Sequence, residues 1–275
     1  MRSKNKEFKI IIKLLLIGFL TTIVRIIGQL FIPSGTQSVL KPSAFVINGT
    51  MPMAFTVYGI FAYMIVASMF LLVKDKICGN GVIKGLKYAI SCCAIWVAYL
   101  LEPLPHVAFI DKFTYPIADS IALLALGIFV GVFLCKREEA DDKITFRINI
   151  CSTLAIVLFF FVGRIILYEI IGIYSSYGDN KIGSIIWAVF VGTVISIVLQ
   201  WLNDKLIVEK PIVRQLILGM VLFGVDLSVF NFFMPLVFDT DILDLIIRTG
   251  VDFCFATIGC FFVGVKNGKN KEKCN

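Results

Sequence analysis

The chain has 275 residues, of which 59% are apolar and only 16% are charged, and its mean hydropathy is +0.92. These values exclude an ordinary soluble domain and indicate an all-α integral membrane protein. The formal net charge of +7 is explained by basic loops that lie against anionic lipids at the cytoplasmic face. It therefore does not indicate a nucleic-acid partner.

Eight segments are long and apolar enough to cross the bilayer core, which a helix of about 20 residues spans. The third is the weakest, because its uninterrupted apolar part covers only residues 88–101. It can cross if Lys84 and Lys87 extend to the interface; otherwise it is a re-entrant or interfacial segment. We expect eight transmembrane helices, with seven as the alternative. The predicted spans are 10–32, 51–73, 86–101, 115–134, 148–174, 182–202, 212–232 and 242–265.

The basic residues predict the orientation of these spans. Twenty of the 26 Lys and Arg residues fall at the two ends of the chain and in alternate connections, whereas four fall on the opposite side. This bias predicts that both termini are cytoplasmic. No A-x-A-like cleavage site follows the first apolar segment, which favours a transmembrane helix over a signal peptide. The high content of Ile, Lys and Asn looks bacterial, so we expect the bacterial cytoplasmic (inner) membrane.

Two matches between the halves of the chain indicate an internal repeat. Arg25 is followed by two isoleucines, as is Arg164, and both Asp119 and Asp252 precede a glycine by 12 residues. We therefore predict two four-helix repeats. Because each has an even number of spans, both enter the membrane in the same direction, and the repeats are parallel.

The repeat sets the predicted domain boundaries. Residues 1–137 form the first four-helix membrane repeat, and residues 148–275 form the second. Residues 138–147 are rich in charged side chains, which predicts a solvated cytoplasmic linker between the repeats.

The usual motifs of enzymes and cofactor sites were not found. The eight cysteines lie in predicted spans or on the cytoplasmic side, where disulfides are not expected, and the single histidine argues against a His-based zinc site. No Walker, G-x-G-x-x-G or G-x-S-x-G pattern occurs. We therefore expect no metal and no cofactor.

Gly127 and Gly131 form a GxxxG pattern, which predicts close helix packing, and Trp187 fits an aromatic belt at the membrane interface.

Charged residues inside the predicted spans are the candidate site, because such residues are costly in a bilayer. All lie in the outer half of the membrane. Pro116 predicts that the fourth span begins close to Asp119. Asp244, Arg248 and Asp252 form an i, i+4, i+8 ladder on the last span. The candidate substrate-binding residues are Arg25, Arg164, Asp119, Asp252, Asp226 and Glu102.

Two interpretations of these charges remain open. In the first, they line a vestibule that opens to the outside, where Arg25 and Arg164 attract a small anionic ligand and the acidic residues orient it or carry protons. In the second, they form structural ion pairs, Arg25 with Asp119 and Arg164 with Asp252. A relay across the whole bilayer would need polar groups in the inner leaflet as well, and none is evident in the sequence.

The sequence therefore predicts a small multi-pass membrane transporter or transporter component with an outward-facing polar cavity. One alternative is a membrane-embedded enzyme that acts on an envelope or lipid-linked substrate at the outer leaflet, with Glu102, Asp119, Asp226 or Asp252 as acid, base or metal ligand. The other is a non-catalytic scaffold or partner subunit of another membrane protein. The missing catalytic motifs make the enzyme less favoured, and no catalytic residue is assigned.

Overall fold

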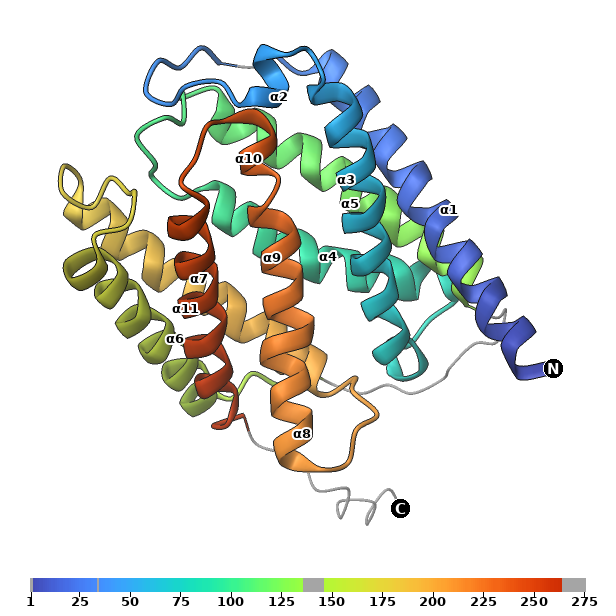
Figure 1. Cartoon of the computed structure of the whole chain (residues 1–275). Coiled ribbons are helices and arrows are strands. Elements are labelled where there is room, and N and C mark those ends of the chain that lie inside the picture. The colour runs from blue at the N-terminus through green and yellow to red at the C-terminus, as the bar shows by residue number, and fades with distance from the viewer. Residues whose placement is uncertain (1, 34, 136–145, 264–275) are drawn as a thin grey trace.

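The computed structural model of the chain describes residues 2–33, 35–135 and 146–263, and these residues form an all-helical fold (Figure 1). Two of the helical elements, η3 and η4, are π-helical, whereas η1 and η2 are short 3-10 turns. In chain order, the elements are α1 (Arg2–Phe31), α2 (Ala44–Ile47), α3 (Met51–Met69), η1 (Phe70–Leu72), η2 (Lys74–Lys76), α4 (Gly81–Leu100), α5 (Asp111–Leu134), α6 (Ile150–Ile165), η3 (Ile166–Ile171), α7 (Lys181–Asn203), α8 (Pro211–Leu216), η4 (Ile217–Val225), α9 (Asp226–Asn231), α10 (Met234–Val237) and α11 (Ile242–Cys260).

Seven helical segments in the described ranges are long and apolar enough to cross a membrane. They correspond to the first seven predicted spans. The eighth prediction falls on α11, which carries Asp244, Arg248 and Asp252 within its 19 residues and is not among the seven. The structure thus supports a polytopic membrane protein, while the count of eight spans stays a prediction.

The third span is longer than predicted. Its helix, α4, begins at Gly81 rather than Leu86 and has 20 residues. The Asn80 side chain accepts a hydrogen bond of 2.9 Å from the Ile83 N–H, which satisfies one of the free donors at the helix start. This cap lies upstream of the apolar run, so hydropathy alone placed the helix start too late.

The predicted start of the fourth span was wrong in a similar way. Its helix, α5, begins at Asp111, and Pro116 lies inside the helix. The Ile110 carbonyl already accepts hydrogen bonds of 3.0 Å from the N–H groups of Phe113 and Thr114. Proline removes one backbone donor but has the φ angle of a helix, so it is tolerated near a helix start. Asp119 therefore lies more than two turns into α5.

The outward faces of the long helices are apolar. Phe8 and Ile12 on α1, Leu154 on α6 and Ile182 on α7 are all exposed, as are many other large aliphatic side chains. A protein surrounded by water rarely exposes apolar patches of this extent. The exposed surface is therefore suited to lipid chains.

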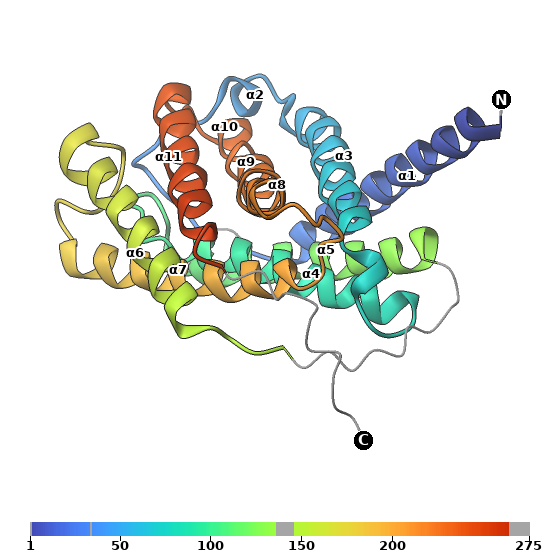
Figure 2. The ribbon, with the colours of Figure 1, turned by 90° about the horizontal axis from the view of Figure 1, so that it is seen from below.

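The helices of each half pack in the same order. In the first half, α1 packs against α3 and α5, and α4 packs against α5. In the second half, α6 packs against α7 and α11, and η4 packs against α11. Both views place α6, α7 and α11 at one end of the molecule and α1 and α3 at the other (Figures 1 and 2).

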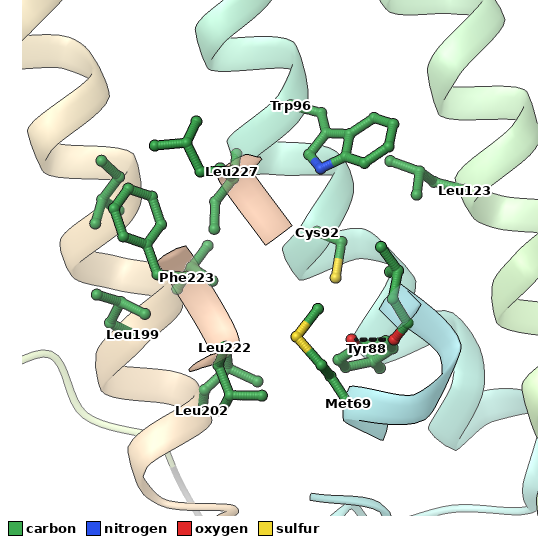
Figure 3. Packing of buried hydrophobic residues seen from close by; sticks show 14 of the residues in the cluster. Met69, Tyr88, Cys92, Trp96, Leu123, Leu199, Leu202, Leu222, Phe223 and Leu227 are labelled. Carbon is green, nitrogen blue, oxygen red and sulfur yellow. Dashed lines mark hydrogen bonds between the residues drawn. The ribbon is translucent and has the colours of Figure 1, made fainter. Parts of the chain in front are cut away.

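The halves meet along a central apolar interface in which α4 contacts α7 and α9, while α3 contacts α9. Figure 3 shows part of it, with Cys92 and Trp96 of α4 near Phe223 and Leu227 of the second half. A second contact lies in the connections, where the Ser43 N–H donates to the Val237 carbonyl at 3.0 Å. The Ser43 hydroxyl also donates to the Leu236 carbonyl at 2.7 Å. We call this contact the Ser43 seam.

The close packing predicted from the GxxxG pattern is present. Gly127 and Gly131 of α5 lie directly against Gly85 and Gly81 of α4. A Cβ atom added to Gly127 would lie only 2.6 Å from the Cβ of Ala89, and one added to Gly85 would overlap the Gly127 carbonyl oxygen. The two backbones approach because neither helix has side chains at these positions. The predicted repeat counterpart of Gly131, at position 264, lies outside the described ranges, as does most of the predicted linker.

Candidate functional site

The fully buried Arg164 lies at the end of α6, where the helix passes into the π-helical segment η3. Its Nη1 lies 2.9 Å from Oε1 of Glu102, and its Nη2 lies 2.5 Å from Oδ2 of Asp252. Asp252 is on α11 of the same half, whereas Glu102 follows α4 of the first half. The guanidinium group thus joins the two halves.

Three aromatic rings surround the Arg164 guanidinium. Its carbon Cζ lies 4.5 Å from the ring centre of Trp187, 5.7 Å from that of Tyr99 and 5.6 Å from that of Phe160. These contacts help to offset the loss of hydration of the charge. The Trp187 indole is buried and donates a 2.9 Å hydrogen bond to the Ala98 carbonyl. The prediction that Trp187 belongs to an aromatic belt was therefore wrong.

Arg248 extends the same cluster along α11. Its Nη1 lies 3.4 Å from Oε2 of Glu102, and its Nη2 lies 3.5 Å from a carboxylate oxygen of Asp244, one turn earlier. Nη2 also donates to the Tyr174 carbonyl. We call Arg164, Arg248, Glu102, Asp252 and Asp244 the Arg164–Arg248 network. Arg248 was not among the predicted site residues, although the i, i+4, i+8 ladder of the last span included it.

The network is incompletely paired. The Nε atoms of both arginines and Oδ1 of Asp252 are buried without a hydrogen-bond partner. The other oxygen of Asp252 accepts a hydrogen bond of 3.2 Å from the Tyr99 hydroxyl. Buried polar groups are normally paired, so these three atoms have hydrogen-bonding capacity that the described residues do not use.

Arg25 forms a separate, simpler site in the first half. Its Nε lies 2.5 Å from Oδ1 of Asp119, its Nη1 donates to Gln29 at 2.8 Å, and its Cζ lies 5.8 Å from the ring centre of Phe55. The pair joins α1 to α5 within one half. Both predicted ion pairs therefore exist, and the structure contains Arg25–Asp119 as well as Arg164–Asp252.

Asp226 lies apart from both arginine sites. It begins α9, directly after the π-helical segment η4, and is 0% exposed. Neither carboxyl oxygen has a hydrogen-bond partner.

The six predicted residues therefore occupy three places: Arg25 with Asp119, Arg164 with Glu102 and Asp252, and Asp226 alone. In the part of the chain that the structure describes, no group of three or more His, Cys, Asp or Glu side chains is placed to hold a metal ion. Comparison of this chain with protein-family models, with curated proteins and with solved structures finds no match.

Proposed function

We propose that the protein is a small membrane transporter, or a component of one, for an anionic solute that enters from outside through a polar cavity. The observation that carries this proposal is the Arg164–Arg248 network, in which two buried arginines share Glu102 across the boundary between the halves. Charge at such a depth is costly and marks solute pathways in many membrane proteins.

The ion pairs of the Arg164–Arg248 network would allow the arginines to exchange Glu102 for an incoming anion. Arginine binds carboxylates and phosphates through paired N–H groups, and here the Nε–H of each arginine has no partner. An incoming anion can take up these donors and replace Glu102, whose two oxygens lie on different arginines. Glu102 would then be free to move with the first half of the molecule.

Several observations support the wider architecture of the proposal. The same three helix pairings occur in both halves, and contacts between the halves join α4 to α7 and α3 to α9, as expected of parallel repeats. We further propose that α11 is an eighth span. With eight spans, the distribution of Lys and Arg supports a topology in which both termini are in the cytoplasm of a bacterial cell.

A second candidate function is that of a scaffold or partner subunit. It is favoured by the burial of the arginines and by their ion pairs, because such pairs also fix how helices pack. A membrane-embedded enzyme has less support, since the carboxylates that it would use lie in three separate places.

Uptake by proteoliposomes tests the transporter proposal. The purified full chain is reconstituted, and entry of radiolabelled phosphate and succinate is measured for wild type, Arg248→Gln and the matched control Arg25→Gln. We expect wild type to take up at least one anion. Arg248→Gln should lower its uptake about tenfold or more, the equivalent of one strong charged hydrogen bond, while Arg25→Gln should retain most of it.

Folding is monitored in parallel by gel filtration. The transporter proposal is wrong if correctly folded wild type neither binds nor takes up either anion. Equal loss of uptake in Arg248→Gln and Arg25→Gln would place the anion site outside the Arg164–Arg248 network.

A further inference from the structure

Asp226 is a carboxyl group that the fold leaves without a partner. It is 0% exposed, both of its oxygens lack a hydrogen bond, and none of the ion pairs in the described ranges includes it. A carboxylate ion in an apolar layer is very costly, and such a group takes up a proton instead. A carboxyl group in these surroundings is therefore expected to hold a proton.

A second buried polar group without a partner lies close to Asp226. The indole N–H of Trp96 lies near the Asp226 carboxyl, and its nitrogen is buried without a hydrogen-bond partner. Trp96 is 1% exposed, and Figure 3 shows its nitrogen turned toward Cys92 and Leu227, the residue after Asp226. An N–H donor stabilises the ionised form of a carboxyl group, so Trp96 is placed to assist release of the proton.

The other titratable groups around Asp226 carry no charge that would neutralise it. On α4, Tyr88 and Cys92 lie near it and are both buried, and the Tyr88 hydroxyl donates to the Val66 carbonyl. On α3, the Tyr58 hydroxyl donates to the Val229 carbonyl at 2.9 Å, and Tyr63 stacks on Trp96. On α11, the charge of Asp252 is taken by Arg164.

The backbone next to Asp226 is also unusual. The nine-residue π-helical segment η4 ends at Val225. The other π-helical segment of the described chain, η3, begins at Ile166, two residues after Arg164. Such segments are rare and occur frequently at functional sites. Both therefore mark a place where a buried ionisable side chain meets an irregular helix.

We propose that Asp226 is a proton-binding site in the membrane interior, which exchanges one proton with the solvent while Trp96 assists its release. A purely structural aspartate at this position would cost stability without forming a side-chain hydrogen bond or ion pair in return. The proposal concerns a proton alone and holds whether or not the Arg164–Arg248 network binds an anion.

Infrared spectroscopy of the purified full chain in lipid tests the proposal. The carbonyl stretch of a protonated carboxyl group is separate from the bands of carboxylates. We expect wild type to show this band at about neutral pH, to lose it reversibly at alkaline pH, and to shift it in deuterium oxide. Asp226→Asn should abolish the band, and the matched control Glu169→Gln, which removes an exposed carboxylate paired with Lys181, should keep it.

Two further measurements complete the test. Trp96→Phe should move the loss of the band to higher pH, because the N–H that stabilises the ion is gone. A carboxyl group that never releases its proton would show no such change. If Asp226→Asn does not fold, mass spectrometry of wild type treated with a hydrophobic carbodiimide, which modifies protonated carboxyl groups, should find the label on Asp226. The proposal is overturned if wild type lacks the band, if Asp226→Asn retains it, or if deuterium oxide leaves it unshifted.

Discussion

Arg25 and Arg164 occupy matching positions in the two halves of the sequence, yet the structure gives them different surroundings. The side chain of Arg25 is 9% exposed and has one carboxylate partner, Asp119. Arg164 is completely buried, has two carboxylate partners and lies among three aromatic rings. The difference arises from Glu102, which reaches Arg164 from the other half. Of the two arginines, only Arg164 therefore forms an ion pair between the halves.

The largest expected effect is that of Arg164→Gln compared with Arg25→Gln. Removing Arg164 leaves Asp252 and Glu102 as buried carboxylates, a loss of about 3–5 kcal/mol in the free energy of unfolding. Removing Arg25 should cost about 1–3 kcal/mol, since the Asp119 side chain is 12% exposed and can be hydrated. Thermal unfolding in detergent, followed by tryptophan fluorescence, measures both.

The double variant Arg164→Gln/Asp252→Asn is the control. Because it removes both charges of one pair, it should recover part of the stability lost in Arg164→Gln. Equal losses for Arg164→Gln and Arg25→Gln would show that the two sites do not differ in energy, whatever their surroundings.

A smaller effect should distinguish a tightly packed glycine from an open one in the first half. Gly85→Ala places a Cβ against the Gly127 carbonyl and should destabilise the protein by about 1–3 kcal/mol. Gly28→Ala on α1 has no neighbouring atom within 4 Å, and it should be neutral or stabilise by up to about 1 kcal/mol. The same thermal assay compares them; a similar outcome for both would mean that the α4–α5 contact adapts to the extra methyl group.

The smallest effect should come from His106, in the connection that also carries Glu102. Burial, together with the charge of Arg248, lowers the pKa of His106 to about 4. In the unfolded chain, His106 has its ordinary pKa of 6.5 and binds a proton below that pH, whereas in the folded protein it stays neutral down to about pH 4. The free energy of unfolding should therefore fall as the pH drops from about 6.5 to 4.

His106→Gln should flatten this part of the pH profile of the melting temperature. The wild-type Nδ1 lies 3.1 Å from the Tyr174 hydroxyl, a contact that glutamine can partly replace. An unchanged slope between wild type and variant would show that His106 does not cause the pH dependence.

Much of the fold follows from patterns that act over short distances along the chain. Apolar runs predicted the helices, and the spacing of Gly127 and Gly131 predicted how α5 packs. The ion pair of Arg164 with Asp252 was predicted because the proposed repeat has one arginine and one aspartate in each half.

The contacts of Glu102 could not be predicted in this way. This residue follows α4, and it reaches Arg164 and Arg248 only through the packing of one half on the other. The isolation of Asp226 was hidden for the same reason, since burial of a charged residue without a partner depends on all the helices around it. The prediction places the start of α5 near Pro116, whereas the helix begins at Asp111, because a proline is compatible with the first turns of a helix.

The Ser43 seam has a mechanical consequence. It ties the long connection of the first half to the backbone after α9, and a further hydrogen bond of 2.9 Å runs from the Asp239 N–H to the Lys41 carbonyl. Backbone hydrogen bonds of this kind do not slide gradually past one another, whereas the apolar side chains between α4 and α9 have no such fixed register. If the halves rotate relative to each other, we expect the smallest displacement of one half against the other at the Ser43 seam and larger displacements farther from it.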